Sequence, residues 1–335
     1  MKFPTTTTIR LAVLAGIALS TPAFATVTID YVPVGNPGNA ADTTGYGAVA
    51  YAYQIARNET TISQYAGFLN AVAKTDTYAL YSTDMTQGNI NGISRSGSSG
   101  TYVYSVTAGS GNRPITHVSW FDAARFTNWL HNGQPSGSQI ASTTEDGAYT
   151  LNGATSGLGF SKNAGARMWI PSEDEWYKAA YYDPNKGGSG VGGYWEQATQ
   201  SNTITSNTVG EAGAANYHDG DYAVTQSESY SDSQNYLTDV GAYGLDSDSA
   251  YGTNDQAGNV YEWNDAGIGS SGGLRGGSWD SPSYLLLAFF RNDTTPTDET
   301  YYVGFRVASV PEPSAYLLTV LSASVMLARR RRSTL

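Results

Sequence analysis

The segment Gly252–Asp265, GTNDQAGNVYEWND, constrains the fold more than any other part of the chain. It is too polar for a core strand and too aromatic for a flexible linker. Irregular backbone that is buried must still satisfy its N–H and C=O groups, either with side chains such as Asn, Asp and Trp or with a bound cation. The segment therefore predicts ordered but irregular structure.

The composition points to the same class of fold. The chain has 38 glycines and 25 tyrosines, and only 14% of its residues are charged. From Tyr194 onward, glycine, asparagine and isolated aromatic residues dominate, and short strands are expected near LRGGSW and VGFRVA. An earlier strand pair is expected in TVTIDYVPVG and GAVAYAYQIA. The pattern, without repeats or linkers, predicts one loop-rich α+β domain.

Three short segments have the spacing of amphipathic helices. The first is TISQYAGFLNAV, whose apolar residues recur every three or four positions. The second begins at SWFDAARFTNWLH, where Ser119 and Asp122 predict an N-terminal cap. The third is PSEDEWYKAAYYDP, with a capping box from Ser172 and Glu175 and a stop at Asp183 before proline.

The N-terminus has the order of an export signal. Positive charge at Lys2 and Arg10 is followed by an apolar run, Leu11–Ser20, and by the small residues Ala23–Ala25. This order is typical of a secretory signal peptide over residues 1–25. We therefore expect the mature protein to begin near Thr26.

The C-terminus, residues 310–335, is also organised as a targeting segment. Pro311, Glu312 and Pro313 precede an apolar stretch, 315–328, and four arginines, 329–332. The stretch is shorter than the ~20 residues that cross a bilayer without tilt, and the arginines favour a cytoplasmic end. This tail resembles the PEP-CTERM sorting signal of Gram-negative bacteria.

The sorting signal implies recognition by an exosortase-type enzyme, transient membrane association through the tail, and delivery to the cell envelope, outer surface or extracellular matrix. Without both ends, residues 26–309 carry a strong negative charge, because the ends remove six basic residues and one acid and leave 12 basic against 28 acidic residues. Such a surface repels nucleic acid and anionic polysaccharide unless a cation intervenes. It suits an exterior that contains calcium.

The chain contains no cysteine. Export would permit disulfides, so their absence predicts a fold that is stable without them. The same absence excludes every mechanism that uses a thiol.

Several motifs, taken in order, resemble the formylglycine-generating enzyme (sulfatase-modifying factor) family. They run from about Arg57 to Ala308 and comprise RNETTISQYAGFLNAV, PITHVSWFDAARFTNWL, IPSEDEWYKAAYYDP, AANYHDG, GTNDQAGNVYEWND, LRGGSW and VGFRVA. The resemblance implies a variant of the C-type-lectin fold that is commonly stabilised by calcium.

The resemblance also implies two calcium sites. In the first, Asp255 and Glu262 supply carboxylate oxygens, and Gly258 and Val260 supply backbone carbonyls. Calcium accepts such mixed oxygen ligands, and glycine lets the backbone curl around an ion. The second site combines Asn216 and the carbonyl of Tyr217 with Asp232 and the carbonyl of Gln234. Alternatively, these Asn and Asp side chains only cap turns.

The catalytic residues of the family are missing. Family enzymes oxidise a substrate cysteine with copper held by two cysteines, which follow the motif that here reads Gly276-Gly277-Ser278-Trp279. Ser281 aligns with the first of these cysteines and Leu286 lies near the second. A hydroxyl and an alkyl chain cannot bind Cu(I), which prefers soft thiolates. We therefore expect no copper and no formylglycine-generating activity.

Other catalytic sites receive little support from the sequence. The three histidines, His117, His131 and His218, show no metal-ligand spacing, and no G-x-S-x-G elbow surrounds Ser281. The acids 173–175 lie in the first turn of a helix, where they complement its dipole.

The arginines of the shared motifs leave two alternatives open. Arg275, Arg291 and Arg306 either tie buried loops together or line a remnant of the substrate groove. In the second case Arg291, with Trp279 and Ser281, forms a candidate groove for a sugar or peptide.

The favoured hypothesis is a non-catalytic exported domain, stabilised by calcium, that binds or structures extracellular matrix, including polysaccharide or other envelope proteins. The alternative is an enzyme of unrecognised type that uses the old groove on an extracellular substrate.

Overall fold

A computed structural model describes residues 26–311 of the chain. The expected signal peptide, residues Glu312 and Pro313 and the apolar and basic tail lie outside the described residues. Within the described part, no helix combines the length and apolarity needed to span a membrane.

The three predicted helices are confirmed as α1 (Ile62–Val72), α2 (Trp120–His131) and α3 (Glu173–Tyr181). The strands are short: β1 (Tyr31–Val34), β2 (Tyr53–Ala56), β3 (Ile93–Ser96), β4 (Val103–Val106), β5 (Met168–Trp169), β6 (Tyr182–Asp183), β7 (Gly193–Tyr194), β8 (Tyr261–Ile268), β9 (Ser271–Arg275), β10 (Asn292–Thr294), β11 (Val303–Gly304) and β12 (Ala308–Ser309). Single helical turns occur at Thr83–Thr86, Ala141–Glu145, Leu245–Ser247 and Ser283–Leu286. The α+β prediction is confirmed.

Each helix begins at a capping box. The Ser119 side chain accepts a hydrogen bond from the Asp122 N–H, and the Asp122 carboxylate accepts one from the Ser119 N–H at 2.8 Å. Ser172 and Glu175 form the same reciprocal pair at the start of α3. These bonds satisfy N–H groups that a helix start would otherwise leave unpaired, so short local motifs fix where the helices begin.

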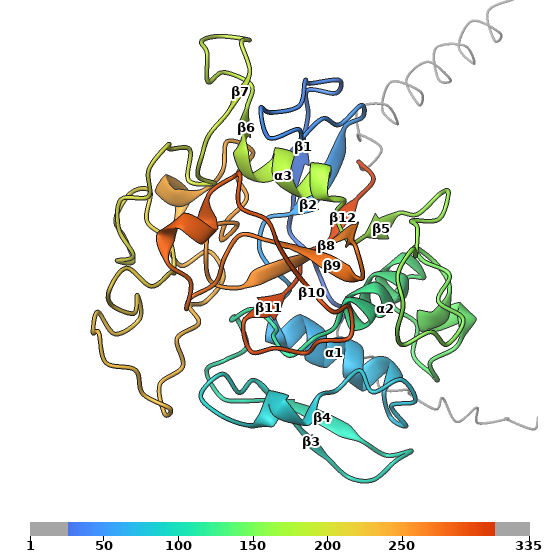
Figure 1. Ribbon diagram of the computed structural model, residues 1–335. Coiled ribbons are helices and arrows are strands. Elements are labelled where there is room, and N and C mark those ends of the chain that lie inside the picture. The colour runs from blue at the N-terminus through green and yellow to red at the C-terminus, as the bar shows by residue number, and fades with distance from the viewer. Residues whose placement is uncertain (1–25, 312–335) are drawn as a thin grey trace, which may run out of the picture.

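Two four-stranded sheets organise the strands (Figure 1). The first has the order β1-β2-β12-β5, so the last described strand pairs with the earliest hairpin through Ala308 opposite Ile55. The second has the order β10-β9-β8-β11 and contains the segment that ends at Trp263. Figure 1 shows α1 and α2 below this second sheet, with the β3–β4 hairpin beyond α1.

The main core lies where α1 and α2 meet the strands. Phe68 of α1 and Phe126 of α2 contact edge to face with ring centroids 5.4 Å apart, and Phe305 contacts Phe126 at the same distance. All three rings are fully buried. Burial of such a side chain stabilises a fold by roughly 1.5–3 kcal/mol, so this aromatic contact is a principal anchor between the helices and the C-terminal segment.

The second half is irregular but closely packed. The prediction of irregular structure for Gly252–Asp265 is correct for residues 252–260 but wrong for Tyr261–Asp265, which begin the buried strand β8 because pairing with β9 satisfies their backbone. Gly258 has φ +82°, and a Cβ on it would lie 2.1 Å from the carbonyl oxygen of Asn216. Only glycine allows this approach, which brings the Asn259 N–H to 2.7 Å from the same carbonyl. The close contact joins two of the segments that carry predicted calcium ligands.

Candidate functional site

Glu262 of the first predicted calcium set pairs with Arg306, and both side chains are fully buried. Arg306 Nε donates to Glu262 Oε2 at 2.6 Å, and Nη2 donates to Oε1 at 2.7 Å. The indole N–H of Trp176 adds a bond to Oε2 at 2.8 Å. Because carboxylate oxygens together offer about four lone-pair positions, Glu262 retains acceptor capacity for a cation.

Two further carboxylates surround this pair. Asp255 Oδ2 accepts the N–H of Gly241 at 2.6 Å, and burial raises the pKa of Asp255 to about 6. Glu59 is buried, and its Oε2 accepts the Asn259 side-chain amide at 2.9 Å. Burial, with the charges of Asp255 and Glu262, raises the pKa of Glu59. Arg306 pairs with Glu262, and the neighbouring charges of Asp255 and Glu59 favour an added cation or added protons.

The surroundings of Asp255 also have room for a small occupant. A cavity of ≈ 10 Å³ is lined by Asp255 together with Tyr243, Thr253 and Asn254. This is close to the smallest volume that holds one water-sized particle. Within residues 26–311, no three His, Asp or Glu side chains converge as a metal cluster, so a cation here depends on carbonyls such as those of Gly258 and Val260. The oxygen donor set fits calcium, which accepts mixed ligands.

The second predicted set is more dispersed. The Asn216 side-chain amide donates to the Tyr236 carbonyl at 2.9 Å and to Asn259 Oδ1 at 3.0 Å. The Tyr217 carbonyl accepts from Asn207 Nδ2 at 3.3 Å, and the Gln234 carbonyl accepts from Asn89 Nδ2 at 2.7 Å.

Asp232 is exposed on the surface loop that precedes Gln234. The contacts of these four residues run to other partners, so this calcium set stays a prediction.

The positions of the family cysteines are closed by packing. Ser281 is 4% exposed, and its hydroxyl oxygen accepts the Ser278 N–H at 2.9 Å and lies 3.0 Å from the Ser278 hydroxyl. Leu286 is fully buried at the end of the 3₁₀ turn Ser283–Leu286. A hydroxyl pair and an alkyl chain thus occupy the place where the resemblance puts the copper-binding thiols.

Trp279 lies at the base of an aromatic stack. Its ring is 5.1 Å from that of Tyr236 at an interplanar angle of 10°, and 6.5 Å from that of Tyr230 at 12°. Tyr222 and Tyr301 flank it at 6.0 and 5.8 Å. We call these five residues the aromatic groove. Trp279 itself is buried, and within residues 26–311 nothing accepts its indole N–H.

The groove opens to solvent on one side. Tyr230 is 50% exposed and Tyr301 is 41% exposed. Both line a cavity of ≈ 350 Å³ whose other walls include the polar residues Asp84, Asn89 and His117. Burial lowers the pKa of His117, so this ring is neutral at physiological pH. A flat, weakly charged ligand with hydroxyl groups matches such a surface.

The other two members of the predicted groove lie in different contacts. Arg291 pairs with Glu173 through bonds of 2.8 and 2.5 Å, and Arg275 donates twice to the same carboxylate at 2.9 and 2.7 Å. Ser281 is buried beside Ser278, as described above. Arg275 and Arg291 therefore tie loops to the start of α3, which is the first of the two alternatives. Of the three predicted groove residues, only Trp279 belongs to the aromatic groove.

Sequence reasoning missed the tyrosines of the groove and Glu59. The tyrosines are separated by up to 79 residues along the chain (Tyr222 to Tyr301), so no local spacing reveals them. Glu59 could have been noticed as an acid in the polar segment RNETT just before a helix. Its burial against Asn259 depends on tertiary packing that local patterns do not encode.

Comparisons with known proteins agree with the fold. A family model described as sulfatase-modifying factor enzyme 1-like domain matches residues 38–310. Variable protein 1 of Treponema denticola has 18% sequence identity and a TM-score of 0.50, and the match covers 86% of this chain and 98% of that one. The structure of CarF has 20% identity and a TM-score of 0.50, covering 86% and 100%.

PvdO from Pseudomonas aeruginosa is similar at 17% identity and a TM-score of 0.43, covering 84% of this chain and 92% of that one. A search of curated proteins found no match. The prediction of a loop-rich, C-type-lectin-like fold of the formylglycine-generating enzyme type is confirmed. On the match over residues 38–310, the chain belongs to the sulfatase-modifying factor enzyme 1-like family.

Proposed function

We propose that this chain is an exported, non-catalytic binding domain that has kept the family fold without its thiol chemistry. The observation that carries the proposal is the close packing of Ser281, which aligns with the first cysteine and bonds to Ser278, and of the buried Leu286, which lies near the second. Neither side chain offers a soft ligand to copper, and the Ser281 hydroxyl lies against the Ser278 hydroxyl.

The proposed ligand is a neutral stretch of extracellular polysaccharide bound in the aromatic groove. Exposed rings such as Tyr230 and Tyr301 present flat apolar faces to a sugar ring, and Asp84, Asn89 and His117 offer polar atoms to its hydroxyls. The excess of acids over bases in residues 26–309 disfavours an anionic polymer unless calcium bridges the two.

Calcium has a structural role in this proposal. Asp255 and Glu262, with the carbonyls of Gly258 and Val260, would hold an ion that offsets the charge of Glu59 and its neighbours. A second ion at Asn216 and Asp232 would brace the loop that carries Tyr230 and Tyr236.

Delivery would follow from the two ends of the chain. The signal peptide would direct export, and the tail with Pro311, Glu312 and Pro313 would be recognised by an exosortase-type enzyme after a transient membrane stage. The domain would then reach the envelope or the surrounding matrix of a Gram-negative bacterium, where other envelope proteins would be its partners.

Affinity electrophoresis in gels that contain the producer's own exopolysaccharide tests this function. Retardation of the purified protein is expected, and Tyr230→Ala should weaken binding about tenfold, equivalent to about 1.4 kcal/mol. Tyr284→Ala is the matched control, because Tyr284 is 57% exposed and contacts Phe290 rather than the groove. Equal retardation of both variants, or none of the native protein, would refute the proposed site.

A further inference from the structure

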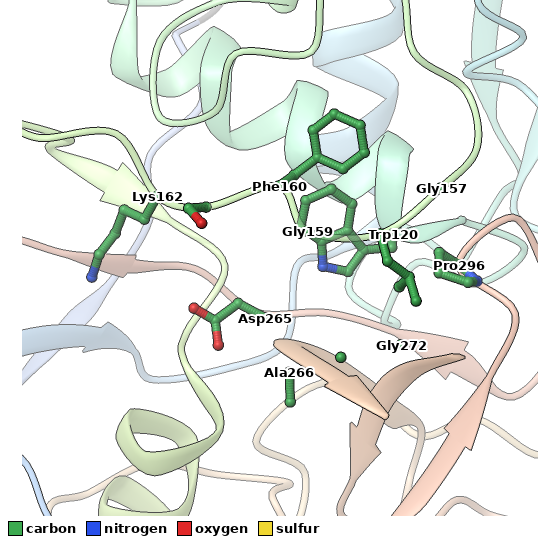
Figure 2. Close-up of a pocket in the computed structure, with 12 residues that line it drawn as sticks. Trp120, Gly157, Gly159, Phe160, Lys162, Asp265, Ala266, Gly272 and Pro296 are labelled. Atoms are coloured by element: carbon green, nitrogen blue, oxygen red, sulfur yellow. The ribbon is translucent and has the colours of Figure 1, made fainter. Parts of the chain in front are cut away.

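A second cavity lies away from the aromatic groove, between the loop 157–162 and the β8–β9 hairpin (Figure 2). It has a volume of ≈ 220 Å³, and its walls include Trp120, Phe160, Lys162, Asp265, Gly272 and Pro296. Figure 2 shows Lys162 and Asp265 on one side of the cavity, with Trp120, Phe160 and Pro296 on the other. The cavity is smaller than most drug-sized sites and suits a side chain or a small fragment.

The apolar wall is held rigidly in place. Trp120 is 6% exposed, and its indole N–H donates to the Asn264 carbonyl at 3.2 Å, which fixes the plane of the ring. Phe160 packs 5.9 Å from Trp120 and 5.4 Å from Phe121. The cavity therefore presents preformed aromatic surface to a ligand.

The polar wall holds one acid, Asp265, and one cation, Lys162, which already pairs with the buried Glu175 behind the wall. Lys162 is engaged, with its ammonium 3.3 Å from Glu175 Oε1 and 3.9 Å from the Trp169 ring centre. Glu175 is fully buried and also accepts bonds from Tyr51 and Trp169. None of the ion pairs within 4.0 Å among residues 26–311 includes Asp265.

Asp265 is therefore a half-buried carboxyl that lacks an ionic partner. Burial raises its pKa to about 7, and the charge of Glu175 adds to the rise, while Lys162 and the N–H of Glu173 lower it. A buried charge without a partner is costly unless a counter-charge is supplied. A ligand that places a positive charge beside Asp265 would therefore gain an ion pair that the protein does not make itself.

We propose that this cavity binds a primary ammonium carried on a flat apolar body, with the ammonium on Asp265 and the body against Trp120 and Phe160. The ammonium would offer three N–H donors and a positive charge to the carboxylate. The aromatic wall would accept the flat apolar body against the Trp120 and Phe160 rings. An anion is disfavoured by Glu175 and Asp265 together.

Titration with benzylammonium, benzyl alcohol and benzoate tests the proposal, because the three probes share one ring and differ in charge. Ligand-observed NMR on the purified protein should show benzylammonium binding at least tenfold tighter than benzyl alcohol, with no binding of benzoate. Equal affinity for the ammonium and the alcohol would contradict the assignment.

Variants separate the site from the fold. Asp265→Asn should abolish the preference for the ammonium, whereas Asp293→Asn, at the exposed position of strand β10, should retain it. Lys162→Met should tighten ammonium binding, because it removes the competing charge. Retention of the preference in Asp265→Asn, with an unchanged melting temperature, would overturn the proposal. Tyr230→Ala should leave this binding unaltered, so the result is independent of the proposed polysaccharide function.

Discussion

Arg306 and Glu262 form a fully buried, bidentate ion pair with bonds of 2.6 and 2.7 Å. Arg306 also donates to the carbonyls of Ala56, Arg57 and Asn254 at 2.8–3.0 Å. One guanidinium thereby satisfies backbone carbonyls from two parts of the chain, residues 56–57 and Asn254, that are far apart in sequence. The pair is a structural hub of the irregular half of the domain, next to the proposed calcium position.

Removal of one partner from this hub should be strongly destabilising. Glu262→Gln leaves the Arg306 charge buried without its carboxylate, a loss of about 3–5 kcal/mol in the free energy of unfolding. Urea denaturation of the variant and the native protein measures the difference. Glu228→Gln, at an exposed loop position, is the control and should change stability by less than about 0.5 kcal/mol.

Removal of calcium should lower the melting temperature, because an ion that binds only the native state stabilises it by mass action. Thermal unfolding with calcium and with EGTA measures the shift. Asp255→Asn should reduce the shift, since it removes one of the two carboxylates of the first set. Asp232→Asn should also reduce this shift, through loss of the carboxylate of the second set. A melting temperature that is the same with calcium and EGTA would exclude both proposed ions.

The stability of the protein should fall as pH rises from 4 to about 7. Asp122 is 2% exposed, and burial raises its pKa from 3.8 to about 7, aided by Glu299 and opposed by Arg125 and by bonds from Ser119. Between these pH values the native state binds more protons than the unfolded state, so the free energy of unfolding falls by at most about 1.4 kcal/mol per pH unit for this group.

Denaturation of Asp122→Asn across the same pH range should give a shallower slope than the native protein. Asp293→Asn, an exposed acid, should leave the slope unchanged. A native slope of the opposite sign would show that other groups dominate the titration.

Tight copper binding should depend on cysteine thiolates, which this chain lacks. Competition with a Cu(I) chelator is expected to show no tight site in the native protein, because Ser281 and Leu286 are hard or inert toward Cu(I). The double variant Ser281→Cys/Leu286→Cys should gain a site. Tight Cu(I) binding by the native protein would contradict the loss of the family chemistry.

Local patterns in the sequence predict the helices and the earliest strand pair. The capping boxes at Ser119 and Ser172 are complete within four residues, and so they can be recognised before any tertiary structure is known. The pairing of Ala308 with Ile55 depends on a return of the chain over more than 250 residues. Such a pairing follows from the family motifs and not from propensity.

The sites were harder to predict than the fold. Trp279 was identified, but its partners Tyr230 and Tyr301 come from loops whose approach is set by long-range packing. The same holds for Asp265, which meets Lys162 and Trp120 only because a loop and a hairpin converge. Sequence reasoning finds residues within motifs, whereas these cavities are built between motifs.

Calorimetric titration of the purified protein with the producer's exopolysaccharide tests the central claim of binding without chemistry. We expect the heat of each injection to fall to zero as the binding sites saturate. The heats should be smaller for Tyr230→Ala than for the native protein. Continuous heat release in proportion to the protein would instead show turnover, and a complete lack of heat at several temperatures would show that the groove holds no such ligand.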